Sequence, residues 1–251
     1  MMSIVALLSA FLLIDAASAA APTDVCEVPK GLLATDIQLT RVAKAIKDNH
    51  RLDIAVVGSG SSSLAGADGA RYAYPERLQE VLTKRLPGNQ IKVTTHVRTR
   101  ETAADMAAEL GKILAAEKPT LVVWQTGTSD AMSGVEADDF RASLDSGVET
   151  IQNASAEVIL MNMQYSPRTE SMLDVSSYAD IMRWVAQQRN AVLFDRLAIM
   201  RYWNDAGAFD LYAATKNYDM ARKVHDCIGR ALASQIIDAA HLDAAEMQTT
   251  R

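Results

Sequence analysis

The segment Leu52 to Gly66 reads LDIAVVGSGSSSLAG, and it decides the fold of this chain. Its first half, Leu52 to Val57, is a short continuous apolar run, and its second half is a turn of glycines and serines. Continuous apolar runs of this length are typical of parallel strands that helices cover on both faces. The segment therefore predicts a buried parallel strand that ends in a tight turn at the edge of a sheet.

Further apolar runs share this character, and segments with helical spacing separate them. The predicted strands are Leu52 to Val57, Ile91 to Thr95, Thr120 to Trp124, Val158 to Met163 and Ala191 to Phe194. The predicted helices are Thr35 to Lys47, Tyr74 to Leu86, Ala103 to Ala116, Phe140 to Asn153, Tyr178 to Gln188 and about Asn217 to Ala240. This alternation predicts an α/β fold, a doubly wound sandwich around a five-stranded parallel sheet.

The N-terminus has the pattern of a signal peptide. An apolar run of about a dozen residues precedes the small residues Ala17-Ser18-Ala19, which is a typical cleavage site. The run is shorter than the roughly 20 residues that cross a bilayer, so we expect no retained membrane span and an exported protein, periplasmic or secreted. No basic residue precedes the run, which leaves a retained anchor as the alternative.

The chain divides into four parts in our prediction. A signal peptide covers residues 1–19, an N-terminal arm with the first helix covers 20–50, one α/β domain covers 51–240, and a short tail covers 241–251.

The chain is 49% hydrophobic, which suffices for one sizeable core. Its 25 basic and 31 acidic residues give a net charge of −6, and no basic stripe alternates with aromatics. This composition excludes nucleic acid as a partner.

The two cysteines are Cys26, near the mature N-terminus, and Cys227, near the C-terminus. An even number of cysteines in an exported chain predicts a disulfide, which here would join the N-terminal arm to the last helix. Two unpaired thiols are the alternative.

Chemistry is expected in the loops that begin at Gly58, His96, Gln125 and Gln164, because open parallel sheets bind ligands at the carboxyl ends of their strands. The first of these loops, Gly58 to Gly66, suits either a phosphate cradle or a nucleophilic serine. It lacks the Lys-Ser/Thr pair and the third glycine of the phosphate motifs. A flexible serine-rich turn without chemistry is the remaining alternative.

The segment Gly60 to Gly66, GSSSLAG, resembles the first block of SGNH/GDSL hydrolases, and the alignment selects Ser62 as the nucleophile. Further matches follow in the order of that family, and they are Tyr74-Pro75-Glu76-Arg77-Leu78, ETAADM from Glu101, WQTGTSD from Trp124, and MNMQYSP from Met161. The resemblance implies a three-layer αβα flavodoxin-like sandwich, hydrolysis of acyl esters, and no metal or organic cofactor. Gln164 and Tyr165 stand at the carboxyl end of the fourth predicted strand, where they would line the substrate cleft, and structural packing is the alternative.

Two positions of the oxyanion site differ from the family pattern. Arg100 stands where the second block carries a glycine, and Ser129 stands where the third block, Gly127-Thr128-Ser129-Asp130, carries an asparagine. The resemblance still implies Arg100, Gly127 and Ser129 as the oxyanion group. Loss of one oxyanion donor typically costs about 10²–10³ in rate, so this chain is expected to be a slow enzyme unless Ser129 or Arg100 compensates.

The catalytic base is the weakest part of the resemblance. His225 is the best-placed histidine, but alignment of the last helix puts Asp219 at the family's histidine position. Either His225 reaches Ser62 from a shifted position, with Asp210 or Asp219 as its acid, or the site has lost its base.

The sequence therefore predicts an exported serine hydrolase that cleaves an acylated saccharide or a small ester through Ser62 and His225. The alternative is an inactive or weak accessory protein of the same fold that binds carbohydrate. A third reading, an anion or phosphate binder that uses the Gly58 to Gly66 loop and Arg100, predicts phosphate binding without hydrolysis.

Overall fold

A computed structural model describes residues 24–212 and 218–242 of the chain. The predicted signal peptide over residues 1–19 lies outside these described residues. Five parallel strands form one sheet in the order β2-β1-β3-β4-β5, which is the flavodoxin-like order. The strands are β1 (Arg51–Gly58), β2 (Gln90–Val97), β3 (Leu121–Gln125), β4 (Glu157–Met161) and β5 (Val192–Phe194). The predicted fold class is confirmed.

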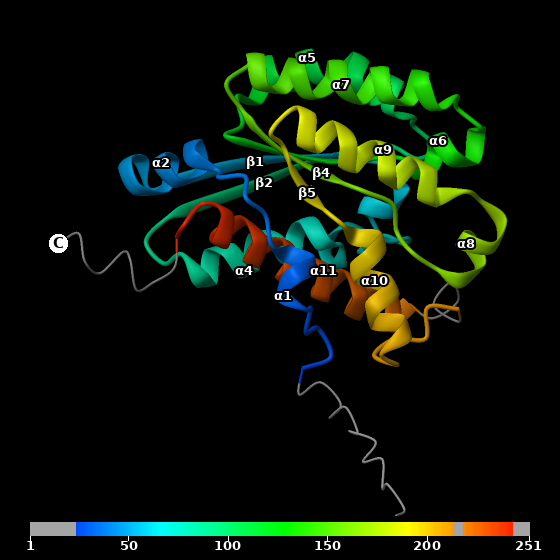
Figure 1. Cartoon of the computed structure of the whole chain (residues 1–251). Helices are drawn as coiled ribbons and strands as arrows, with labels where there is room; N and C mark the ends of the chain where they lie inside the picture. Colours follow the sequence, from blue (N-terminus) through cyan, green and yellow to red (C-terminus); the bar gives the residue numbers. More distant parts are fainter. Residues whose placement is uncertain (1–23, 213–217, 243–251) are drawn as a thin grey trace, which may run out of the picture.

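Helices cover both faces of the sheet (Figure 1). The described helices are α1 (Lys30–Leu33), α2 (Thr40–Asn49), α3 (Gly69–Tyr72), α4 (Tyr74–Arg85), α5 (Ala103–Glu117), α6 (Thr128–Ser133), α7 (Ala137–Asn153), α8 (Pro167–Met172), α9 (Val175–Gln188), α10 (Arg196–Asp205) and α11 (Tyr218–Ala239). Helices α5, α7 and α9 pack side by side on one face, and α4 packs against α11 on the other. None of the described helices combines the length and the apolar character that a membrane span needs.

Strand β3 is buried throughout, and β1 and β4 are buried except near their first residues, as their continuous apolar sequences predict. Strand β2 was also predicted to be buried, but it lies at the edge of the sheet and none of its residues is buried. Helix α7 packs closely against the sheet, because a Cβ atom on Gly147 of α7 would lie 2.3 Å from the ring of Trp124 on β3. The register pairs Gly58 with Gln125 and Gln125 with Met161. The carboxyl ends of β1, β3 and β4 are therefore level, and the loops that follow them meet at one edge.

A disulfide joins Cys26 to Cys227, as predicted. It ties the N-terminal arm to α11, and two further contacts hold the same arm. Asp24 forms an ion pair with Arg230, and the Nε1–H of Trp203 donates to the carbonyl of Glu27 over 3.0 Å. The arm is therefore part of the folded domain.

The short helices α1, α3, α6 and α8 were not predicted, and two longer helices differ from the sequence prediction for reasons that are not local. Helix α2 begins at Thr40, because the Glu157 carboxylate at the start of β4 accepts the backbone N–H groups of Arg41 and Val42 over 3.0 and 2.9 Å. Helix α10 was not predicted, and it begins after Asp195, whose side chain accepts the N–H of Ala198 over 3.0 Å. Both helix starts are capped by carboxylates at the ends of strands.

Candidate active site

Ser62 lies in a short 3-10 turn, Gly60–Ser62, that follows the end of β1. Its backbone N–H donates to the carbonyl of Ser59 over 2.8 Å, and its side chain is buried. Gly58 is required beneath it, since a Cβ atom there would lie 2.4 Å from the Ser62 Oγ. The glycine-serine turn thus holds the predicted nucleophile against the end of the sheet.

Among the described residues the hydroxyl of Ser62 has two partners, and neither is a histidine. It donates to the Oε1 of Gln125 over 2.8 Å, and its Oγ lies 3.0 Å from the hydroxyl of Tyr74. Because the single proton of Ser62 goes to Gln125, the Tyr74 hydroxyl is the donor in the second bond. Burial raises the pKa of Tyr74 to about 12, so this phenol is neutral at physiological pH. An amide oxygen and a neutral phenol leave Ser62 without a base in contact.

Gln125 organises the whole turn. Its Oε1 also accepts the backbone N–H and the hydroxyl of Ser59, both over 3.2 Å, and the hydroxyl of Ser61 over 3.1 Å. Its Nε2 is buried and has no partner among the described residues. Such an unpaired buried donor is costly, and it sits beside the predicted nucleophile.

His225 lies on α11 and is held by Tyr74 rather than by a carboxylate. Its Nδ1 accepts the backbone N–H of Tyr74 over 3.0 Å, and the two rings stack with centroids 6.0 Å apart. Burial, and then the charge of Arg196, lower the pKa of His225 from 6.5 to about 3. The ring is therefore neutral, and its proton is on Nε2 because Nδ1 is an acceptor. Tyr74 contacts both Ser62 and His225, and no hydrogen bond within the described chain joins those two directly.

The two predicted acids, Asp219 and Asp210, are exposed. Asp219 is on the first turn of α11, where its side chain is 83% exposed and lies 3.9 Å from Arg222. Asp210 is exposed, and its Oδ1 accepts the backbone N–H of Tyr212 over 3.2 Å. In a Ser-His-Asp triad the acid accepts a hydrogen bond from the Nδ1–H of the histidine. Nδ1 of His225 instead accepts the backbone N–H of Tyr74, so it has no proton to donate to an acid. The roles of Asp210 and Asp219 as acids stay predictions.

The predicted oxyanion group is spread over two loops. Arg100 is exposed and has a left-handed backbone with φ of 66°, and Ser129 is half-buried near the start of α6. The N–H of Gly127 donates to the Oδ2 of Asp130 over 3.2 Å and is therefore already used. Gly127 itself needs to be glycine, because its φ is 98° and a Cβ atom would lie 2.4 Å from the Sδ of Met163.

Asp130 links the loops after β2 and β3. Its Oδ1 accepts the N–H of Ala103 at the start of α5 over 2.9 Å, and its Oδ2 accepts the hydroxyl of Thr126 over 3.2 Å in addition to the N–H of Gly127. Burial raises the pKa of this carboxyl, and the hydrogen bonds act in the opposite direction. Asp130 is thus a structural anchor of the site.

We expect Asp130→Asn to lower the free energy of unfolding by about 1–3 kcal/mol, because one of the two acceptor oxygens becomes an NH₂ group that faces a donor. Urea denaturation of the two proteins measures this difference. The exposed Asp139→Asn variant is the matched control, and it should leave the midpoint unchanged. Equal stability of Asp130→Asn and the parent protein would show that the anchor is dispensable.

Arg196 is a site residue that the sequence reasoning missed. It starts α10, and its buried Nη1 donates to the carbonyl and hydroxyl of Ser61 over 3.1 and 3.4 Å. Its Nη2 lies 3.5 Å from the Oε1 of Gln164, and its buried Nε has no partner in the described chain. No carboxylate pairs with it in the described chain, and burial lowers its pKa to about 10. The signal was available in the polar pair Asp195-Arg196 directly after the last predicted strand.

The two predicted cleft residues have different surroundings. Gln164 reaches toward Arg196 and is half-buried, so it belongs to the same group of side chains as Ser61. Tyr165 is buried, and the guanidinium of Arg201 on α10 lies 5.3 Å from its ring centroid. Burial is the main cause that raises the pKa of Tyr165. Tyr165 thus packs against α10, and the cleft roles of Gln164 and Tyr165 stay predictions.

A small cavity of about 170 Å³ lies beside Ser62. Its lining combines polar and charged side chains with apolar ones, and the residues are Ser62, Ser63, Ala70, Arg71, Ala73, Pro75, Glu76, Val93, Thr95 and Val97. A cavity of this size suits a short acyl group rather than a long chain.

Comparison with known protein families identifies the family of this chain. A sequence profile described as the Non-GDSL lipase-like family matches residues 25–242. The chain belongs to the Non-GDSL lipase-like family. The predicted resemblance to SGNH hydrolases is thereby confirmed. None of the curated proteins compared with this family member matches it.

Solved structures confirm the fold of this Non-GDSL lipase-like protein. An acetylxylan esterase from Geobacillus stearothermophilus superposes with a TM-score of 0.60 at 20% identity, over 74% of this chain and 94% of the esterase. A psychrotrophic esterase from Pseudoalteromonas sp. gives a TM-score of 0.58 at 18% identity, over 74% of this chain and 97% of that one. At this identity the likeness establishes the SGNH hydrolase fold.

Proposed function

We propose that this Non-GDSL lipase-like protein is an exported ester hydrolase with slow turnover, in which Ser62 is the nucleophile. The observation that carries the proposal is the position of Ser62, whose hydroxyl is fixed at the carboxyl end of β1 by Gln125 and Tyr74. Membership of a lipase-like family supports the reaction class. The disulfide is compatible with an oxidising compartment outside the cytoplasm.

The proposed reaction is acyl transfer to water. The Ser62 Oγ attacks the ester carbonyl, the alcohol leaves with a proton, and water then releases the acid from the acyl-serine. A short acyl group, such as the acetyl group of a saccharide ester, fits the cavity of about 170 Å³ beside Ser62. The acetylxylan esterase of the same fold is consistent with this substrate class.

The proposal assigns the proton transfer to His225, and this step explains the slow turnover. In the arrangement described above, the proton of the neutral ring is on Nε2, because Nδ1 accepts from Tyr74. His225 must therefore exchange this contact before it accepts the proton of Ser62. Loss of the histidine from a serine protease triad lowers kcat by about 10⁶, which sets the scale for a poorly placed base.

A second candidate is favoured by the same contact. If His225 never leaves Tyr74, the protein binds an acylated saccharide without cleaving it. The two candidates share the fold and the ligand class and differ only in whether Ser62 becomes acylated.

Reaction with a serine-directed fluorophosphonate, followed by intact mass, distinguishes the candidates. We expect the mature protein to gain one adduct slowly, at a rate well below that of a typical serine esterase, and Ser62→Ala to gain none. The matched control is Ser176→Ala, which removes an exposed hydroxyl on α9 and should be labelled like the parent protein. His225→Asn keeps an acceptor for the Tyr74 N–H but no base, and it should lose the labelling.

N-terminal sequencing after periplasmic expression checks export and cleavage near Ala20.

The outcomes are exclusive. If the parent protein stays unlabelled while a known serine esterase reacts, the hydrolase proposal is wrong and the binding protein is the better description. If His225→Asn is labelled at the parental rate, Ser62 is the nucleophile and His225 is not its base.

A further inference from the structure

Arg196, the first residue of α10, is the only lysine or arginine in the described chain that is buried, with 1% of its surface exposed. No described carboxylate forms an ion pair with it, and its buried Nε has no hydrogen-bond partner among the described residues. Burial lowers its pKa to about 10, so the guanidinium is charged at physiological pH. A buried charge without a carboxylate costs folding free energy. A stabilising role therefore does not explain Arg196.

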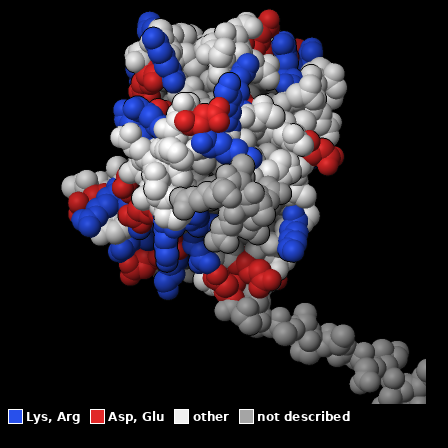
Figure 2. All heavy atoms as spheres, turned by 90° about the vertical axis from the view of Figure 1, so that its left-hand side faces the viewer, with Lys and Arg blue, Asp and Glu red and all other residues white. Residues whose placement is uncertain are grey.

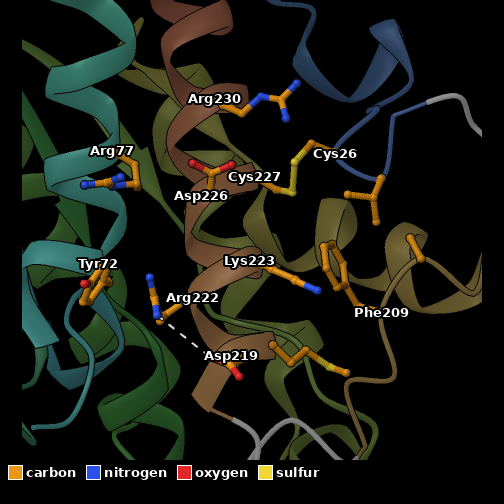
Figure 3. A pocket seen from close by; sticks show the side chains of 13 residues that line it. Cys26, Tyr72, Arg77, Phe209, Asp219, Arg222, Lys223, Asp226, Cys227 and Arg230 are labelled. Atoms are coloured by element: carbon orange, nitrogen blue, oxygen red, sulfur yellow. Dashed lines mark ion pairs between the residues drawn. A yellow bond between two sulfur atoms is a disulfide. The ribbon is translucent and has the colours of Figure 1, made fainter.

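Cations on the surface of the molecule have different surroundings. Figure 2 shows basic and acidic side chains interspersed over one face of the protein. Figure 3 shows a surface groove along the first half of α11, where Arg222 stacks on Tyr72 and lies 3.9 Å from the carboxylate of Asp219. Water and nearby acids compensate such surface charges. Burial and the lack of an acid partner in the described chain leave the charge of Arg196 uncompensated.

Arg196 contacts the turn that carries Ser62. Its Nη1 donates to the carbonyl oxygen of Ser61 over 3.1 Å, and this carbonyl belongs to the peptide bond between Ser61 and Ser62. The same Nη1 lies 3.4 Å from the Oγ of Ser61. Because the Ser61 hydroxyl accepts from Arg196, its own proton goes to the Oε1 of Gln125 over 3.1 Å. The hydroxyl of Ser62 donates to the same oxygen, so Arg196 helps to order the hydrogen bonds of the nucleophile.

Arg196 also lies near the second support of Ser62, the side chain of Tyr74. Its Cζ is 5.8 Å from the centroid of the Tyr74 ring, and the hydroxyl of that ring donates to the Ser62 Oγ. Burial is the main cause of the raised pKa of Tyr74, and the hydrogen bond to Ser62 and the charge of Arg196 act in the opposite direction. Burial, and then the same charge, lower the pKa of His225. The charge of Arg196 thus favours negative over positive charge in the site.

We propose that Arg196 is a positioning residue for the reaction of Ser62, because it holds a positive charge against the turn where negative charge develops. This inference rests on the proposed function. In that reaction the Oγ of Ser62 bonds to the ester carbonyl carbon, the Ser62 proton passes to His225, and the carbonyl oxygen becomes an oxyanion. Arg196 takes no part in the transfer and acts through Ser61 and Tyr74. A fixed charge in a buried site stabilises a developing anion more than the same charge in water does.

Fluorophosphonate labelling followed by intact mass, combined with urea denaturation, tests this role. Arg196→Met keeps an unbranched side chain without the charge, and Arg196→Lys keeps a charge without the planar group. We expect Arg196→Met to be labelled at least tenfold more slowly than the parent protein. Its urea midpoint should be equal or higher, because a buried charge without a carboxylate partner has been removed. At pH 6, which favours the charged form of a buried lysine, Arg196→Lys should be labelled faster than Arg196→Met.

The matched control is Arg141→Met. It removes an arginine of α7 whose side chain is 47% exposed, and it should change neither the rate of labelling nor the urea midpoint. This control separates the effect of a charge beside Ser62 from the effect of a lower net charge.

A residue with a merely structural role would give a different pattern, since its loss would lower the urea midpoint. A clearly lower midpoint for Arg196→Met overturns the inference, and so does labelling of this variant at the parental rate. Labelling of Arg196→Lys that is no faster than that of Arg196→Met also overturns it. In these cases the parent protein is labelled and the proposed function stands. A parent protein that stays unlabelled contradicts the proposed function itself, and the inference falls with it.

Discussion

Acidification from pH 7.5 to pH 5 is expected to lower the free energy of unfolding by about 2 kcal/mol through His225 alone. Burial, and then the charge of Arg196, lower the pKa of His225 from 6.5 to about 3 in the folded protein. Below pH 6.5 the unfolded chain gains a proton that the folded protein does not bind. Stability therefore falls with the pH from 6.5 down to about 3, and the total loss over this range is several kcal/mol.

The neighbours of His225 do not change charge in this window. The pKa of Tyr74 is about 12 and that of Arg196 is about 10, so both keep their charge state between pH 5 and pH 7.5. His225→Asn is the matched variant, because an Asn amide oxygen can accept the backbone N–H of Tyr74 as Nδ1 does. Urea denaturation at several pH values should show the acid loss in the parent protein and its absence in His225→Asn. If the free energy of unfolding fell equally with pH in the two proteins, the buried and neutral state of His225 would be contradicted.

The fold was predictable because its determinants are local. Four of the five strands are apolar runs with buried residues, and such runs are visible in Val158 to Met163 as clearly as in Leu52 to Val57. The edge strand β2 is the exception, because none of its residues is buried although the sequence predicted a buried strand there. The starts of α2 and α10 were less predictable. Glu157 caps a helix 115 residues away from it in sequence, and no local pattern reports such a contact.

The candidate site was predictable only in part. The glycine-serine turn at the end of the first strand was visible as a candidate for chemistry, but only the resemblance to SGNH/GDSL hydrolases selected Ser62 within it. Tyr74 was visible as part of a motif, but its bridging contacts to Ser62 and His225 depend on how α4 and α11 pack. Arg196 is a buried cation without a carboxylate partner in the described chain, an arrangement that side-chain chemistry alone argues against. Rules derived from typical burial fail where a functional site departs from them.

Removal of the disulfide is expected to have the largest effect on stability. Cys26 and Cys227 are 201 residues apart in sequence, and the chain-entropy relation gives about 5 kcal/mol for closing a loop of this length. This loss is comparable with the whole stability of a small domain, which is about 5–15 kcal/mol. The ion pair of Asp24 with Arg230 and the bond from Trp203 to Glu27 stay in place, so the arm should remain docked and the fold should persist.

The Cys26→Ala/Cys227→Ala variant measures this contribution by urea denaturation, and the reduced parent protein is the control that keeps both side chains. Both should unfold at a much lower urea concentration than the oxidised protein, and they should agree with each other. A loss below about 1 kcal/mol in both would mean that the unfolded chain gains little freedom when the bond is absent. A protein that depends on this bond for a large part of its stability would fold securely only where disulfides form, which ties the stability of the domain to the export that its N-terminus predicts.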